Sequence, residues 1–272
     1  MTADALSGFS REQFRDGTTV HDTYRLGSGP AVIVISEVPG ITPGVAGFAR
    51  RVAGRGMTVV LPHLFGTPGR EPSGRYAAGT IARLCISREF SGLALGRCSA
   101  VISWLRALAR AEHQRCGGPG VGVVGMCYTG GFGLCMAVDE AVLAPVLSQP
   151  ALPFAIGAAR RADVQMSAAD WDRVQQRARD EDLCVLGLRF TGDRAVPAER
   201  FATLREKLGG NFIAVELDSS PGNPYGHPRN AHSVLTEHLQ DRPGTPTHDA
   251  LVQVLDFLAG RLVGDGSAGP RG

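Results

Sequence analysis

Apolar runs and amphipathic segments alternate along most of the chain. The apolar runs are rich in β-branched residues and predict strands at residues 31–36, 57–61, 121–124, 141–147, 183–190 and 212–217. The intervening segments have helical spacing and predict helices at residues 45–55, 91–111, 132–139, 169–179, 197–208 and 248–262. Residues 20–26 predict a first edge strand. Strands that alternate with helices in this way predict an α/β fold, a mostly parallel sheet covered by helices on both faces.

The chain shows no break in composition that would divide it, so we expect one domain over residues 19–263. Residues 1–18 are polar and predict a loose N-terminal arm. The glycine-rich residues 264–272 predict a disordered tail. Segments 66–80 and 218–245 are rich in glycine, proline or polar residues and predict long loops.

Composition excludes several classes of function. The 28 Lys and Arg residues against 26 Asp and Glu leave a net charge of +2, which gives no surplus for a nucleic acid or a membrane surface. Aromatic residues make up 6% of the chain, too few for a platform that stacks single-stranded bases. The first residues lack the basic start and apolar segment of a signal peptide. We therefore expect a cytoplasmic protein whose six cysteines are reduced.

The segment Gly-Met-Cys-Tyr-Thr-Gly-Gly at residues 125–131 directly follows the apolar run 121–124. It predicts a strand, a tight turn and a helix start, with the thiol of Cys127 at the apex of the turn. This arrangement is a nucleophile elbow, usually written G-x-S-x-G, with cysteine in place of serine. Because the thiolate is the reactive form of cysteine, the neighbours of Cys127 would control its reactivity.

A nucleophile needs a base, and the base needs an orienting acid; on this fold they follow the nucleophile in the order acid, then histidine. Asp193 leaves the predicted strand 183–190 in a Gly-Asp turn, and the elbow favours it as the acid over a plain turn or cap residue. Four histidines beyond the strand 212–217 qualify as the base by order: His227, His232, His238 and His248. His232 is preferred because a polar turn gives way to apolar residues there, which would hold the imidazole partly buried. His227, between glycine and proline, is the alternative.

Glu37 follows the predicted strand 31–36, so its carboxylate would point into the crevice where open α/β sheets bind ligands. Near a thiol, this carboxylate could hold or accept a proton. A cap or a surface ion pair is the alternative role. The amide of Val38 would be placed as one oxyanion donor, and the amide of Tyr128, at the helix start after Cys127, as the other.

Four segments together resemble the dienelactone hydrolase family. They are Ser-Glu-Val-Pro-Gly-Ile-Thr at 36–42, the elbow at 125–131, Gly-Asp-Arg-Ala-Val-Pro at 192–197 and Ala-His-Ser at 231–233. The similarity runs from about residue 20 to residue 262. It implies an α/β-hydrolase fold with a Cys-His-Asp triad that cleaves ester or enol-lactone bonds, of the carboxymethylenebutenolide type, without a cofactor.

Carried over to this chain, the resemblance makes Cys127 the nucleophile, Asp193 the acid and His232 the base. Glu37 matches a glutamate that interacts with the resting thiol and is displaced when substrate arrives. Val38 and Tyr128 match the two oxyanion amides.

The resemblance also implies two arginines that hold a substrate carboxylate. Arg88 is the candidate for the first, with Arg83 or a surface role as alternatives. The position of the second holds Thr236, so a bidentate carboxylate clamp is lost and dienelactone itself is in question as the substrate. Thr129 stands where the elbow motif has its second glycine, and we expect this small side chain to be tolerated.

The leading hypothesis is a cofactor-independent hydrolase of a small ester or lactone, acting as a monomer or homodimer. A relative that binds ligands but turns them over weakly is the second hypothesis, supported by Thr129, Thr236 and the long loop 218–245. A redox sensor at Cys127 is the third, although no resolving cysteine is evident. No spacing of His, Cys and Asp matches a metal-ligand set, so no metal is expected.

Overall fold

The computed structural model describes residues 4–86, 100–152 and 157–264. Within these residues, eight strands form one sheet in the order β1-β2-β4-β3-β5-β6-β7-β8. Pairing is antiparallel between β1 and β2 and between β2 and β4, and parallel across the rest of the sheet. The strands are β1 (Ser10–Asp16), β2 (Thr19–Gly27), β3 (Ala31–Ile35), β4 (Thr58–Pro62), β5 (Val121–Met126), β6 (Val142–Ser148), β7 (Val185–Phe190) and β8 (Phe212–Leu217).

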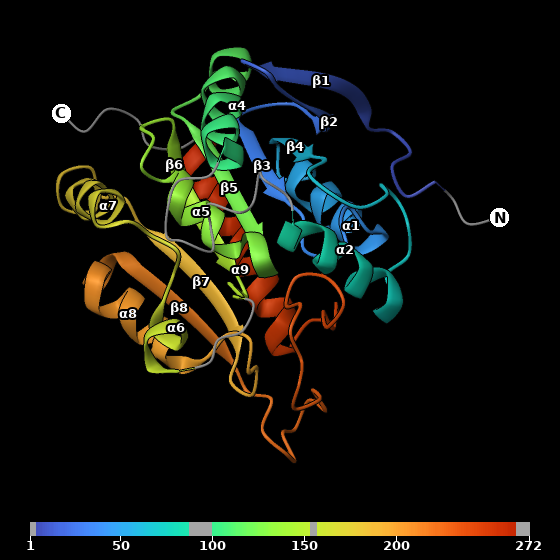
Figure 1. The fold of residues 1–272 in the computed structure, drawn as a ribbon, viewed down its shortest axis with the longest axis vertical. Coiled ribbons are helices and arrows are strands. Elements are labelled where there is room, and N and C mark those ends of the chain that lie inside the picture. Colours follow the sequence, from blue (N-terminus) through green and yellow to red (C-terminus); the bar gives the residue numbers. More distant parts are fainter. Residues whose placement is uncertain (1–3, 87–99, 153–156, 265–272) are drawn as a thin grey trace.

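Helices cover both faces of this sheet. The described α-helices are α1 (Pro43–Ala53), α2 (Gly74–Ile86), α4 (Ala100–Cys116), α5 (Gly130–Met136), α6 (Ala158–Ala162), α7 (Ala168–Asp180), α8 (Ala198–Leu208) and α9 (Pro246–Leu262). Short 3₁₀ turns lie at η2 (Cys127–Thr129) and η3 (Gly209–Asn211). Figure 1 shows α4 and α5 in front of the sheet and α9 behind it. None of the described helices is both long and apolar enough to cross a membrane.

The central strand β3 shows why the sheet needs two covers. All five of its residues are fully buried. Ala31, Ile33 and Ile35 pack into the core with α4, α5, α7 and α8, whereas Val32 and Val34 pack with α1 and α9. Because successive side chains of a strand point to opposite faces, a continuous apolar run marks a strand buried on both sides. The predicted fold class is confirmed.

The N-terminal end of the sheet differs from the prediction. Residues 10–16 are not a loose arm but the edge strand β1, which pairs with β2 along its whole length. The strand predicted at 20–26 is therefore second in the sheet, not at its edge. Most of β1 is exposed and polar, and it is held by the backbone ladder, with Phe14 packing edge-on against Trp104 at 5.4 Å. A strand held mainly by backbone hydrogen bonds needs no alternation of apolar and polar residues, so its sequence gave no signal for a strand.

Two helices were also missed. α2 begins at Gly74, inside the predicted loop 66–80, where the hydroxyl of Ser73 accepts a hydrogen bond from the Tyr76 amide at 3.3 Å. The short α6 was not expected either. The helix predicted at 91–111 corresponds to α4, which continues to Cys116; residues 91–99 lie outside the described part of the chain.

Candidate active site

Cys127 occupies a sharp turn between β5 and the 3₁₀ turn that leads into α5. Its φ is +56°, a left-handed conformation that a non-glycine residue rarely adopts. A side chain at Gly125 would bring a Cβ within 2.2 Å of the Thr129 carbonyl oxygen, so only glycine fits there. The turn therefore has the tight geometry of a nucleophile elbow, with the half-buried Cys127 at its apex.

Asp193 and His232 meet at the same edge of the sheet. His232 Nδ1 lies 2.6 Å from Asp193 Oδ2. Asp193 is 7% exposed, and its other oxygen accepts a hydrogen bond from the Ala195 amide at 2.9 Å. Cys127 is also close enough to the His232 imidazole to raise its pKa. The structure thus brings the three residues together in the order Asp193, His232, Cys127.

The pKa of His232 reflects these neighbours. Burial of the ring is the largest single effect and lowers the pKa. The hydrogen bonds and charges of Asp193 and Cys127 together outweigh it, so the pKa of His232 is raised well above the usual 6.5. An imidazole that keeps its proton at neutral pH is suited to stand beside a thiolate.

The other candidate histidines lie in different settings. His227 is 4% exposed and packs on the ring of Phe190 at 5.0 Å, and its buried Nε2 has no hydrogen-bond partner within the described residues. His248 faces Asp241 at 3.2 Å. His238 contacts the backbone of His232 with its ring. The geometry therefore favours His232 over His227 as the partner of Asp193.

Glu37 is buried in a cluster of hydrogen-bond donors. Gln149 Nε2 donates to Oε2 at 3.1 Å, Ser233 Oγ donates to the same oxygen at 2.6 Å, and Thr236 Oγ1 donates to Oε1. Because Ser233 follows His232 directly, the carboxylate ties the end of β3 to the segment that carries the imidazole. The expected interaction of Glu37 with the resting thiol stays a prediction; the thiol contact described above is with His232.

Thr129 fits the elbow because its hydroxyl finds partners there. The side chain is fully buried, and Oγ1 accepts a hydrogen bond from the Met126 amide at 3.0 Å. The carbonyl oxygens of Met126, Ile35 and Ser36 lie 2.9 Å, 3.0 Å and 3.3 Å away as acceptors. The hydroxyl thus joins the elbow to the segment that leads into Glu37, and threonine is accommodated where the motif has glycine.

The two expected oxyanion residues lie on either side of this junction. Val38 follows β3 and Tyr128 follows Cys127, and all three side chains pack against the same core cluster. Tyr128 lies in the 3₁₀ turn, so its amide is at the start of a helical segment. Their role as oxyanion donors stays a prediction.

The expected carboxylate clamp has less support. Arg88 lies outside the described residues. Arg83, the alternative, is exposed on α2. Thr236 occupies the position of the second arginine and donates its hydroxyl to Glu37.

Two residues of the site were not recognised from the sequence. Gln149 follows β6 as Glu37 follows β3, so a polar residue at the carboxyl end of a buried strand was the available signal. Ser233 is adjacent to the preferred histidine, but nothing in its sequence context indicates a bond to a residue 196 positions away.

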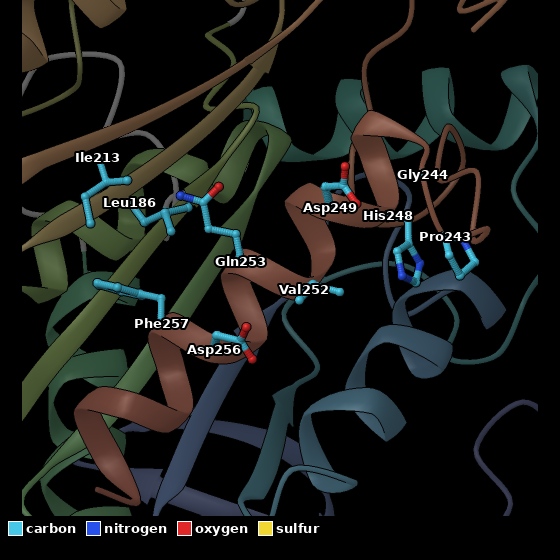
Figure 2. A pocket seen from close by; sticks show the side chains of 10 residues that line it. All are labelled: Leu186, Ile213, Pro243, Gly244, His248, Asp249, Val252, Gln253, Asp256 and Phe257. Atoms are coloured by element: carbon cyan, nitrogen blue, oxygen red, sulfur yellow. The ribbon is translucent and has the colours of Figure 1, made fainter. Parts of the chain in front are cut away.

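A cavity of about 530 Å³ lies away from these residues. Figure 2 shows it along α9, where Gln253 and Phe257 lie on the side of Leu186 and Ile213. Of the candidate residues named above, His248 lines it; Cys127, Asp193, His232 and Glu37 do not. Within the described residues, no group of three or more His, Cys, Asp or Glu side chains could hold a metal ion.

A cysteine elbow above a largely parallel sheet, with a histidine and an aspartate at the same edge, defines a protein of the α/β-hydrolase fold. Residues 18–259 match the family model described as "Dienelactone hydrolase family". The chain belongs to this family.

Solved structures share the fold at low identity. A dienelactone hydrolase-like promiscuous phosphotriesterase, P91, from metagenomic libraries has a TM-score of 0.60 and 17% identity, covering 93% of this chain and 98% of that chain. A cold-adapted esterase from an Arctic intertidal metagenomic library has a TM-score of 0.57 and 16% identity, covering 93% of this chain and 92% of that chain. A comparison with the curated proteins gave no match.

Proposed function

We propose that the protein is a cofactor-independent hydrolase of small esters or lactones that uses Cys127 as its nucleophile. The observation that carries this proposal is the chain of contacts from Asp193 through His232 to Cys127, with Cys127 held at positive φ on the elbow. Membership of the dienelactone hydrolase family supports it.

In the first half of the reaction, the thiolate of Cys127 attacks the carbonyl carbon of the substrate. The carbonyl electron pair moves to oxygen, where the amides of Val38 and Tyr128 stabilise the negative charge. The intermediate then collapses, the carbon–oxygen bond to the leaving group breaks, and His232 gives its proton to the departing oxygen. The products of this half are an alcohol or enol and a thioester on Cys127.

In the second half, neutral His232 takes a proton from water, and the hydroxide formed adds to the thioester carbonyl. Collapse of this intermediate breaks the carbon–sulfur bond and releases the carboxylic acid. Cys127 leaves as a thiolate beside protonated His232, which restores the starting state. Asp193 keeps the imidazole oriented and stabilises its positive charge throughout.

The contacts of Glu37 support a substrate without a carboxylate at this position. Thr236 supplies one hydroxyl to Glu37 where the family pattern has a guanidinium, and a hydroxyl cannot form the bidentate pair that arginine forms with a carboxylate. We therefore propose that neutral esters and lactones react faster than anionic ones.

The test is a burst assay with p-nitrophenyl acetate and a neutral enol-lactone on the wild type, Cys127→Ala and His232→Ala. We expect kcat to fall by about 10³-fold or more in both variants. Cys127 and His232 act as one unit, so the loss of either residue removes the contribution of both. Cys184→Ala, which removes a thiol just before β7, is the matched control and should keep wild-type activity.

Undiminished turnover in Cys127→Ala would overturn the proposal. A wild type that binds small acids tightly but turns over no ester would favour the weakly catalytic ligand-binding relative instead. A carboxylate-bearing lactone that reacts faster than its neutral analogue would overturn the proposed preference for neutral substrates.

A further inference from the structure

His238 closes the turn that carries the proposed base. Its ring Nδ1 lies 3.4 Å from the amide nitrogen of His232 and 3.3 Å from that of Ser233. Its own amide donates to the carbonyl oxygen of Ser233 at 2.9 Å. One residue therefore holds both the amide side and the carbonyl side of this short backbone segment.

The arrangement fixes the protonation state of the ring. Two N–H donors that point at one ring nitrogen require a lone pair on it, so Nδ1 of His238 must be unprotonated and the proton must sit on Nε2. A second proton, on Nδ1, would face the amide hydrogens of His232 and Ser233. The two hydrogen bonds would then be replaced by repulsion between N–H groups, and His238 would no longer hold the His232–Ser233 backbone.

The surroundings of His238 favour the neutral ring. Burial is the largest effect and lowers its pKa below the usual 6.5; the opposing charge of Glu237 is the next largest. The ring also packs edge-on against Phe190 at 6.0 Å. The titratable groups that face it come from the end of β3, the loop after β7 and its own loop, and they are Glu37, Asp193, His227, His232 and Glu237.

The backbone segment that His238 contacts, His232–Ser233, also determines the position of the proposed base His232. His232 reaches Asp193 with Nδ1, and the neighbouring Ser233 is bonded to the buried Glu37. A displacement of this segment would move the imidazole relative to Asp193 and Cys127 together. Misplacement of a catalytic group by about 1 Å can reduce a rate by about a hundredfold.

We propose that neutral His238 is a positioning residue for this site, which holds the His232–Ser233 backbone through Nδ1 and releases it when the ring is protonated. The effect on ester hydrolysis rests on the proposed function. The geometric consequence of this positioning, the reactivity of the Cys127 thiol beside a correctly placed His232, can be measured without any ester.

The test compares the pH dependence of Cys127 alkylation by iodoacetamide in the wild type, His238→Asn and His238→Leu, from neutral to mildly acidic pH. The rate measured in Cys127→Ala is subtracted to remove the other thiols. Asparagine places an oxygen acceptor near the position of Nδ1 but does not titrate. Leucine fills the space and removes the acceptor. His113→Asn, at a half-buried histidine in the last turn of α4, is the matched control.

We expect the wild-type rate to fall more steeply at acid pH than the rate of His238→Asn, because protonation of His238 releases the backbone that places His232. His238→Asn should keep most of the neutral-pH rate and lose this additional fall. His238→Leu should react about tenfold or more slowly than the wild type at neutral pH and approach the wild-type rate at acid pH, with kcat for esters reduced and KM little changed at neutral pH. The control should follow the wild type.

Superimposable pH profiles of the wild type and His238→Asn would overturn the proposal, as would wild-type reactivity in His238→Leu at neutral pH. If the leucine variant fails to fold, the comparison of the asparagine variant with the wild type decides alone. The expected alkylation profiles in a protein without ester turnover would overturn the proposed function and leave the positioning role in place.

Discussion

Arg200 lies buried on α8, and its guanidinium donates a hydrogen bond to the carbonyl oxygen of Ala195, 2.9 Å away. The same nitrogen donates to the carbonyl oxygen of Pro150 at 2.7 Å. Ala195 belongs to the loop of the proposed acid Asp193, and Pro150 packs against Gly130 of the elbow helix. One side chain thus fixes the acid loop relative to the nucleophile turn. Burial lowers the pKa of Arg200 to about 10.

We predict that Arg200→Met destabilises the protein and weakens catalysis together. The variant leaves several buried carbonyl oxygens without a donor, so we expect the free energy of unfolding to fall by about 2–4 kcal/mol. Urea unfolding measures this change. Arg205→Met, which removes a half-exposed arginine from the same helix, is the control and should change stability by about 1 kcal/mol or less. Equal effects of the two variants would contradict the bridging role of Arg200.

A second prediction concerns the proton on His232. Asp193→Asn removes the strongest support for the imidazolium while it preserves the size of the side chain. We expect the His232 titration midpoint, which NMR of the ring carbons should place well above 6.5 in the wild type, to move to lower pH. Catalysis should fall by about 10³- to 10⁴-fold. An unchanged midpoint would mean that Asp193 does not control the pKa of His232.

The same contact predicts how stability depends on pH. Because the folded-state pKa of His232 is raised, its contribution to stability is fully present below the unfolded value of 6.5 and is lost as pH rises through the higher folded value. The wild type should therefore lose stability relative to Asp193→Asn over that interval. Urea unfolding at a series of pH values measures the difference. Parallel curves for the two proteins would contradict the linkage.

Local signals in the sequence were sufficient for much of the site. Cys127 follows a buried apolar strand and precedes glycines, and Glu37 and Asp193 leave buried strands at the carboxyl edge of the sheet. Parallel strands bring these ends together, so their proximity follows from the fold class. His232 was preferred because of its chain order and its partly apolar context, and the structure places its ring against Asp193.

Other features depend on contacts that leave no local pattern. Gln149 bonds to Glu37 across 112 positions of the chain, and no periodicity links the two. His238 was recognised only as an alternative base, because its acceptor role depends on how the chain turns after His232. The edge strand β1 is polar and is held by backbone pairing, so its sequence resembled a loose arm.

Thr129 gives a further prediction. Thr129→Val keeps the shape of the side chain but leaves the buried Met126 amide without its 3.0 Å acceptor, and it also breaks the link to Ile35. We expect a loss of about 1–3 kcal/mol in stability and a lower kcat, because the elbow and the Glu37 segment are no longer joined. Thr129→Ser keeps the hydroxyl and should stay close to the wild type in both measurements. A valine variant with wild-type unfolding and kcat would contradict this role.

Alanine substitutions at Gly125 and Gly260 are expected to change the stability of the protein in opposite directions. A Cβ at Gly125 would lie 2.2 Å from the Thr129 carbonyl oxygen, so Gly125→Ala must open the elbow. We expect it to lower the melting temperature and abolish Cys127-dependent turnover. Gly260 lies within α9, where a Cβ would meet no atom of another segment within 4 Å, so Gly260→Ala should stabilise the protein by about 0.5–1 kcal/mol. Thermal unfolding of both variants tests the pair, and a stable, active Gly125→Ala would show that the elbow is less tightly packed than its geometry requires.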